Sequence, residues 1–184
     1  MSNKTQKPIK NGSARNGEGG FTLIEAVIAI FVLTIGLIGT AAAITFALEF
    51  SSISRNVTSG KLVITSTIEE IESLRNSKRL EFRQIEHVGS VDNTGAANLF
   101  NGFSSGFKPI SFDPGPDGVN GTDDDPTGTG QIREGYQREI VITNLTGSTT
   151  IKKIEVKVQY PAAPGKFGEI VGVAYLNDEF RITR

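Results

Sequence analysis

The sequence predicts an α+β fold, in which a long N-terminal helix, half of it transmembrane, packs its second half on a small antiparallel β-sheet. Three observations predict this fold. Residues 26–48 form an uncharged and largely apolar run. Apolar residues then recur at helical spacing as far as residue 74. Near the C-terminus, three segments alternate apolar and polar residues with a period of two, which is typical of strands in an antiparallel sheet with one solvated face.

The first twenty residues form a polar, basic segment that lacks the apolar side chains a folded core needs. Four Lys or Arg residues against Glu18 give residues 1–20 a net charge of +3. Such a leader is expected in the cytoplasm, with the C-terminal part of the chain across the membrane. Because the whole chain has a net charge of −1, the 164 residues that follow carry −4. We therefore expect no binding to nucleic acid, whose phosphates attract a basic surplus.

The uncharged run predicts a membrane-spanning helix over residues 21–48. It holds 23 consecutive residues without a charge. At about 1.5 Å per residue, this length crosses the roughly 30 Å hydrocarbon core of a bilayer. A secretory signal peptide has a shorter apolar region, with small residues at a cleavage site behind it. Here the small residues Gly19 and Gly20 come before the run, so cleavage after Gly20 would keep the helix in the mature chain.

Glu25 lies four residues inside this apolar helix. A charged side chain in hydrocarbon costs roughly 3 kcal/mol or more without a partner, so such a residue is a functional hypothesis by default. If the chain is cut between Gly20 and Phe21, the new α-amine of one copy can neutralise Glu25 of the next copy in a filament. The alternative is a plain single-pass anchor with an accidental Glu25 whose carboxylate reaches the interface.

Residues 20–25, with the sequence GFTLIE, are followed directly by the apolar helix. This stretch resembles the class III signal of type IV prepilins and type II secretion pseudopilins. The resemblance implies that a prepilin peptidase cuts after Gly20 and N-methylates Phe21, and that Phe21 and Glu25 act in assembly. It also implies a pilin-like fold without enzymatic activity.

Two further segments, residues 35–39 and 68–76, resemble minor pilins of the PilV type. The sequence departs from many major pilins in having Ala42 where they carry a Pro about twenty residues into the mature helix. The resemblance implies a single-pass protein of the bacterial cytoplasmic membrane, with its C-terminal domain outside the cytoplasm. Its partners would be prepilin peptidase, other pilin subunits and the pilus or type II secretion assembly machinery, and its final location a pilus or pseudopilus.

Residues 49–85 are predicted to continue the helix as the amphipathic helix of a globular domain. Apolar residues fall at steps of three, four or seven: Phe50, Ile53, Val57, Ile64, Ile68, Ile71 and Leu74. This stripe is expected to form the core against a sheet, and the alternative is that it binds a partner. The single histidine, His87, is expected to be a surface or capping residue.

The last part of the chain, residues 136–184, is predicted to be an antiparallel β-sheet with strands near residues 136–144, 153–160 and 169–177. The middle segment has the clearest alternation, with four residues on one face: Ile154, Val156, Val158 and Tyr160. In the last segment, one face carries Val171, Val173 and Tyr175, and the opposite face is also apolar. The short segment 145–148 predicts a hairpin between the first two strands.

Residues 86–135 form a long Gly- and Asp-rich connection, and such loops are usually functional or disordered. Within it, residues 99–107 place three Phe residues among Gly and Ser. These aromatic side chains either close the edge of the core or form an exposed contact with a subunit or ligand.

The acidic part of this connection, residues 113–125, holds five Asp residues with glycines that permit tight turns. Ca²⁺ takes six to eight oxygen ligands, and such a loop can wrap one. The candidate ligands are Asp113, Asp117, Asn120, Asp123 and Asp125. The segment does not fit the EF-hand pattern. It resembles GPDG…GTxDD loops that recur in exported bacterial proteins, and some pseudopilins stabilise a late loop with calcium. The alternative is a solvated acidic turn.

Two classes of function follow from these features. The first is a structural subunit of a type IV pilus-like filament, a minor pilin of the PilV type, with a type II secretion pseudopilin as the alternative. The second is a binding module, an adhesin or surface-binding domain mounted on the pilin helix. No base, nucleophile or phosphate-binding loop accompanies the acidic segment, which argues against an enzyme.

Overall fold

The computed structural model describes residues 20–163 and 165–178, so the predicted leader over residues 1–20 lies outside the described residues except for Gly20. The chain divides into two units, Met1–Phe46 and Ala47–Arg184. The described part of the first unit is almost entirely helical. The second unit contains the rest of this helix and every strand of the sheet.

The elements follow one another as one long helix, a short 3-10 helix and four strands. Their bounds are Leu23–Asn76 (α1), Phe82–Gln84 (η1), Lys108–Ser111 (β1), Ile132–Asn144 (β2), Ile151–Ala163 (β3) and Lys166–Asn177 (β4). The strands form one antiparallel sheet in the order β1-β2-β3-β4. The predicted α+β fold, a long helix packed on a small antiparallel sheet, is confirmed.

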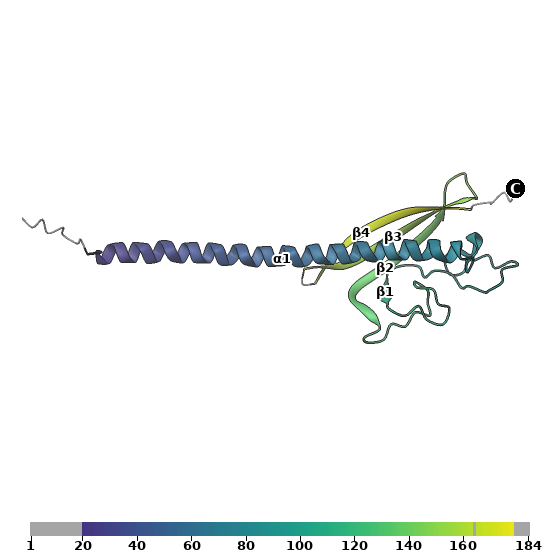
Figure 1. Ribbon diagram of the computed structural model, residues 1–184, viewed down its shortest axis with the longest axis horizontal. Helices are drawn as coiled ribbons and strands as arrows, with labels where there is room; N and C mark the ends of the chain where they lie inside the picture. The colour runs from purple at the N-terminus through teal and green to yellow at the C-terminus, as the bar shows by residue number, and fades with distance from the viewer. Residues whose placement is uncertain (1–19, 164, 179–184) are drawn as a thin grey trace, which may run out of the picture. The chain divides into compact units, whose positions relative to one another are not determined.

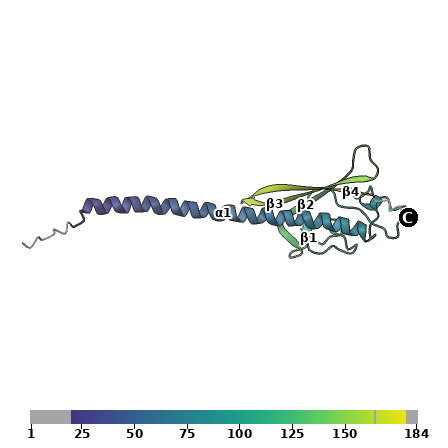
Figure 2. The same cartoon turned by 45° about the horizontal axis from the view of Figure 1, so that its top comes forward.

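In the second unit, β3 and β4 lie along the second half of α1, as two views of the ribbon show (Figures 1 and 2). Two glycines let the helix approach the sheet closely. A Cβ atom added to Gly60 of α1 would come within 2.7 Å of Cδ1 of Ile170, and one added to Gly172 of β4 within 2.2 Å of Cγ2 of Ile64. Each glycine therefore provides the space that an isoleucine of the opposite element fills.

The predicted apolar stripe of α1 contributes to the core from Ile64 onward, while Ile53 and Val57 are half-buried. Ile64, Ile71 and Leu74 are buried, while Phe50 is 65% exposed. Buried Gly60, Val63 and Thr67 widen the stripe. Partner binding through this face is therefore excluded for the residues that the sheet already covers.

The alternation predicted for β3 is also confirmed: Ile154, Val156 and Val158 are all 0% exposed. The same face of β3 carries Lys152, which is 3% exposed and was not expected inside. Its Nζ donates hydrogen bonds of 2.9 Å to the carbonyls of Phe82 and Ile85 and forms a 2.8 Å ion pair with Glu86. This lysine thus ties the segment after α1 to the sheet.

The long connection is more structured than its composition predicts. It contains β1, which pairs with β2, and two of its aromatic residues, Phe100 and Phe103, are buried with their rings edge to face at 5.3 Å. Of the two hypotheses for the aromatic segment, closure of the core edge is therefore confirmed for these two residues. Leu99, at 85% exposed, lies outside the core.

His87 was expected to be a surface or capping residue, but it is half-buried and contacts the sheet. Its Nε2 accepts a hydrogen bond of 3.1 Å from the backbone N–H of Ile142, and its backbone pairs with Phe103. The prediction was wrong because the chain after α1 turns back against β2, a long-range contact without a local sequence pattern.

Candidate assembly and processing site

A hydroxyl side chain caps the N-terminus of helix α1. Thr22 precedes the first helical residue, Leu23, and its Oγ1 accepts a hydrogen bond of 3.3 Å from the backbone N–H of Glu25. The carbonyl of Thr22 accepts the N–H groups of Glu25 and Ala26. A threonine that satisfies a free N–H group in this way is a helix N-cap.

Glu25 is therefore the third residue of the helix, in its first turn. The sequence TLIE (residues 22–25) has the capping-box pattern, in which Glu or Gln follows the N-cap at this position. A carboxylate there also interacts favourably with the helix dipole, by about 0.3–1 kcal/mol. This local role of Glu25 was not among the predictions, although the T-x-x-E pattern of residues 22–25 indicates it.

Gly20 and Phe21 lie just before the helix. Both are exposed, Phe21 to 81%. A Cβ atom on Gly20 would have no neighbour within 4 Å, and its φ is outside the left-handed region. The fold of this chain thus tolerates a side chain at position 20, so a requirement for glycine there would come from an enzyme that acts on the segment.

The first unit presents an apolar surface. Every described residue from 20 to 46 is exposed in the single chain. The helix is long and apolar enough to cross a membrane. Its hydroxyl groups are satisfied within the helix, because Thr34, Thr40 and Thr45 donate to the carbonyls of Ile30, Leu37 and Ala41. Side chains of this kind suit lipid or the apolar faces of other helices.

In the second unit, the acidic segment is held mainly by its own backbone. Oδ1 of Asp113 accepts the N–H of Gly115 at 3.0 Å, and Oδ1 of Asp117 accepts that of Val119 at 2.8 Å. Asn120 is not grouped with the aspartates: its side chain donates to Glu70 of α1 at 2.9 Å. These bonds fasten the segment to itself and to the helix.

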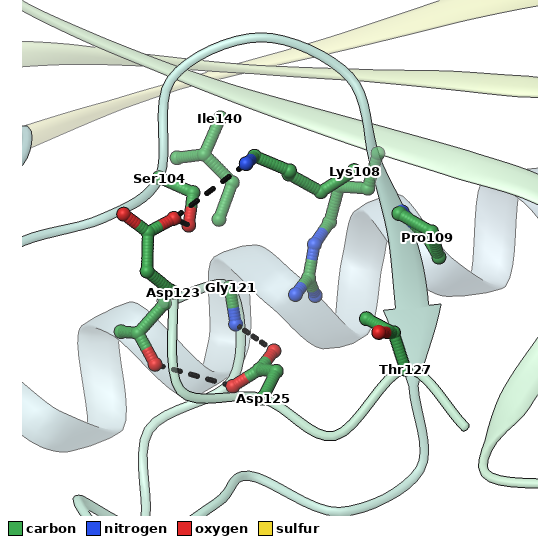
Figure 3. Close-up of a pocket in the computed structure, with 10 residues that line it drawn as sticks. Ser104, Lys108, Pro109, Gly121, Asp123, Asp125, Thr127 and Ile140 are labelled. Carbon is green, nitrogen blue, oxygen red and sulfur yellow. Dashed lines mark hydrogen bonds and ion pairs between the residues drawn. The ribbon is translucent and has the colours of Figure 1, made fainter.

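The remaining candidate ligands, Asp123 and Asp125, lie at a hollow, where Lys108 extends toward Asp123 (Figure 3). Asp123 accepts a hydrogen bond from Ser104 Oγ at 2.5 Å and lies 3.7 Å from Nζ of Lys108. Asp125 accepts the N–H of Gly121 at 2.7 Å and lies near the guanidinium of Arg138. Lys108, Asp123, Asp125 and Arg138 line a hollow of about 220 Å³ between β1, β2 and the acidic segment.

Arg138 is the residue of this region that the sequence analysis missed. It is only 8% exposed, and its Nη1 donates to Oγ1 of Thr67 on α1 at 2.9 Å. Burial lowers the pKa of its guanidinium, and the charges of Asp125 and Glu70 oppose that shift. Arg138 therefore links β2, α1 and the acidic segment through one buried side chain.

The carboxylates of the segment differ in their electrostatics. Burial raises the pKa of Asp117 and of Asp125 above the ordinary 3.8. The hydroxyl of Thr122, which donates to Asp124 at 2.6 Å, lowers the pKa of that carboxyl. The fold thus disfavours the ionised form of Asp117 and Asp125 and favours the ionised form of Asp124.

The arrangement does not form a calcium cage in this conformation. Among the described residues, no group of three or more His, Asp or Glu side chains is placed to hold a metal ion. The candidate oxygens accept hydrogen bonds from their own loop, and protein cations already lie beside Asp123 and Asp125. Calcium binding by the segment stays a prediction, for which a test is given below.

The comparison with protein families bears on the N-terminal region. A model described as the prokaryotic N-terminal methylation motif matches residues 15–41, which include Gly20, Phe21, Glu25 and the first turns of α1. A search of the curated proteins found no match, and neither did a search of the solved structures. The motif supports a membrane-anchored subunit of the type IV pilin or pseudopilin kind.

Proposed function

We propose that this chain is a structural subunit of a type IV pilus-like filament, most like a minor pilin of the PilV type. Prepilin peptidase cuts it after Gly20 and methylates the new α-amine of Phe21. The observation that carries this proposal is the methylation motif over residues 15–41, which coincides with the start of an apolar helix of membrane-spanning length.

Before assembly, the chain is held in the bacterial cytoplasmic membrane by a single pass of α1, with the second unit outside the cytoplasm. In the filament, the exposed apolar side chains of the first unit pack against the same surface of neighbouring subunits. This exchange replaces lipid contacts by helix contacts, so the apolar surface remains covered in both locations.

Glu25 fixes the axial position of each subunit. Its carboxylate pairs with the α-amine of Phe21 of a neighbour, a group that exists only after cleavage. An unpaired charge in hydrocarbon costs roughly 3 kcal/mol or more, so a subunit one step out of register is strongly disfavoured. Processing and assembly are linked because the cut creates the partner of the carboxylate.

The substitutions Glu25→Gln and Glu25→Val test this role in cells that depend on the chain for filaments. Gln keeps a residue suited to the third position of a capped helix but removes the charge. Both variants should enter the membrane normally, as immunoblots of membrane fractions would show. Both should reduce filament number by roughly tenfold or more, because the charge pair is lost.

The matched control is Glu49→Gln, which neutralises the next carboxylate along the exposed helix and should leave filament number unchanged. Normal filament counts for Glu25→Gln, with few filaments for Glu25→Val, would refute the charge pair and leave only the helix-capping role.

A type II secretion pseudopilin is the alternative, because the same motif marks both kinds of subunit. Deletion of the gene separates the two: loss of surface filaments with normal protein secretion supports a pilus subunit. Loss of secretion with normal filaments supports a pseudopilin.

A further inference from the structure

The two edges of the β-sheet differ in how they are protected. β1 forms one edge with only four residues, contains Lys108 and Pro109, and has a register shift between Pro109 and Ser111. Short length, lysine, proline and irregular pairing are the features by which proteins prevent an edge from pairing with another strand. β1 is therefore a blocked edge.

β4 forms the other edge and has such protections only at its start, where Lys166 lies and where its pairing with β3 shifts register between Pro161 and Ala163. It has twelve residues and no proline, and its only lysine is Lys166 at its first position. Among the described residues, only β3 pairs with it. A row of backbone N–H and C=O groups is therefore open for a further strand.

The outward side chains of β4 are largely apolar. Phe167 is 64% exposed, Val171 50%, Val173 47% and Tyr175 61%. The inner face is already used, because Ile170 and Gly172 contact α1. The outer row is thus a second apolar face that the fold of the chain leaves uncovered.

The neighbouring charges on the outer face already have partners. Lys153 lies 2.7 Å from Glu155, and Lys157 lies 3.1 Å from Glu139. Glu169, in the middle of the apolar row of β4, makes no ion pair within 4 Å in the part of the chain that the structure describes. The edge thus combines an apolar row with one exposed carboxylate, which has no ion-pair partner within 4 Å among the described residues and only the more distant charge of Lys157 acting on it.

We propose that the free edge of β4 accepts an extended strand from a different subunit of the same filament. This strand carries apolar residues at alternate positions, opposite Val171, Val173 and Tyr175, and a Lys or Arg opposite Glu169. Backbone hydrogen bonds supply the affinity and the alternate side chains supply the specificity. The identity of the partner as a filament subunit rests on the proposed function.

Among the described residues, the chain offers no equivalent strand, because β1, β2 and β3 already pair within the sheet. In a head-to-tail arrangement, β4 of one copy would pair with the other sheet edge of a second copy. Among the described strands this edge is β1, which is blocked.

Two-fold pairing of β4 with β4 of a second copy is less complementary. If Val171 of one copy lies opposite Val173 of the other, Glu169 lies opposite Tyr175 and remains without a cation. Such pairing also closes on itself and cannot propagate along a filament. These two arguments favour a different subunit as the partner.

A photo-crosslinking side chain in place of Val173, in the full chain in cells, tests the proposal. The probe is benzoylphenylalanine, and the control is the same probe in place of Leu99, which is 85% exposed but lies in the connection. The Val173 probe should give one defined product that the Leu99 probe does not give. Mass spectrometry should map it to an extended segment of a different protein that carries the N-terminal methylation motif.

Charge reversal in the same experiment tests the specificity. Glu169→Lys should lower the yield of the product by about tenfold, because like charges oppose each other across the pair. If Glu169→Lys fails to accumulate, Glu169→Gln serves in its place, with a smaller loss of the same sign.

A product that joins Val173 to residues 171–175 of a second copy would overturn the proposal in favour of self-pairing. Absence of a product above the Leu99 control would also overturn it. Filament counts from the same cultures, with and without the gene, report separately on the proposed function. A chain that is needed for filaments but gives no product would refute only the strand pairing.

Discussion

Glu25 has one role in the local structure of α1 and a second, proposed role in assembly. Within the chain, it is the third residue of α1, and its N–H is bonded to the Thr22 hydroxyl. In the proposed mature subunit it is the fifth residue, with a carboxylate available to a neighbour. The sequence predicted the second role because an intramembrane charge requires a partner, and the structure adds the first.

Lys152 provides a residue-scale test of the second unit. The substitution Lys152→Met fills similar volume but leaves the carbonyls of Phe82 and Ile85 without a donor and Glu86 without a cation. We expect a loss of about 3 kcal/mol in the free energy of unfolding of the full chain in detergent.

The control for this substitution is Lys153→Met, at the next position on the outer face, where the side chain is 35% exposed. It should change the free energy of unfolding by less than about 0.5 kcal/mol. Equal effects of the two substitutions in chemical denaturation would contradict the bracing role of Lys152.

Asp117 and Asp124 should respond to pH in opposite directions. Because burial raises the pKa of Asp117 above 3.8, its ionisation destabilises the fold as the pH rises through the folded-state pKa. Asp117→Asn should therefore raise the melting temperature at pH 7, and this gain should vanish below pH 3.8.

Hydrogen bonding from Thr122 lowers the pKa of Asp124, so its charge stabilises the fold above pH 3.8, and this stability is lost as the pH falls. Asp124→Asn should therefore lower the melting temperature at pH 7. Melting-temperature changes of the same sign for the two variants would contradict this assignment.

The calcium hypothesis for the acidic segment is tested by the same melts. It expects the melting temperature of the full chain to be several degrees higher with Ca²⁺ than with a chelator, with the difference lost in Asp117→Asn. Identical melting temperatures in the two conditions would end the hypothesis.

At the scale of elements, the helix and the sheet are joined by small residues at the points of closest approach. A Cβ atom on Gly172 would lie 2.2 Å from Cγ2 of Ile64, a branched position that cannot rotate away freely. Gly172→Ala should therefore reduce the free energy of unfolding by about 1–3 kcal/mol.

The double variant Gly172→Ala with Ile64→Leu checks this cause, because leucine has no branch at Cβ. The two changes together should cost less than the sum of the single changes, as measured in a double-mutant cycle. Additive costs would show that the contact between these residues is not the origin of the effect.

The sequence predicted the elements with strong periodicity and missed those without it. The apolar stripe of α1 and the alternation of β3 each follow from a local pattern of burial. Lys152 lies on the same face of β3 as Ile154 and Val156, so the alternation predicts that it is buried. Its charge argued against burial. β1 has only four residues, too few to show a period.

At the scale of the whole molecule, long-range contacts explain most of what remained unpredicted. Asn120 and Glu70 are separated by 50 positions, and Arg138 and Thr67 by 71. Nothing in the local sequence relates such pairs, so the acidic segment was predicted as a calcium-binding loop or a solvated turn, without its hydrogen bonds to α1. The N-terminal motif, in contrast, is local and continuous, which is why it could be recognised.

The most direct test of the central claim is the intact mass of the chain in purified filaments. We expect a chain that begins at Phe21, lacks residues 1–20 and carries one methyl group on its α-amine. The same preparation of a Gly20→Leu variant should contain no such chain, and the membranes of those cells should hold the uncut form of 184 residues. Filaments that contain the uncut chain would contradict the account.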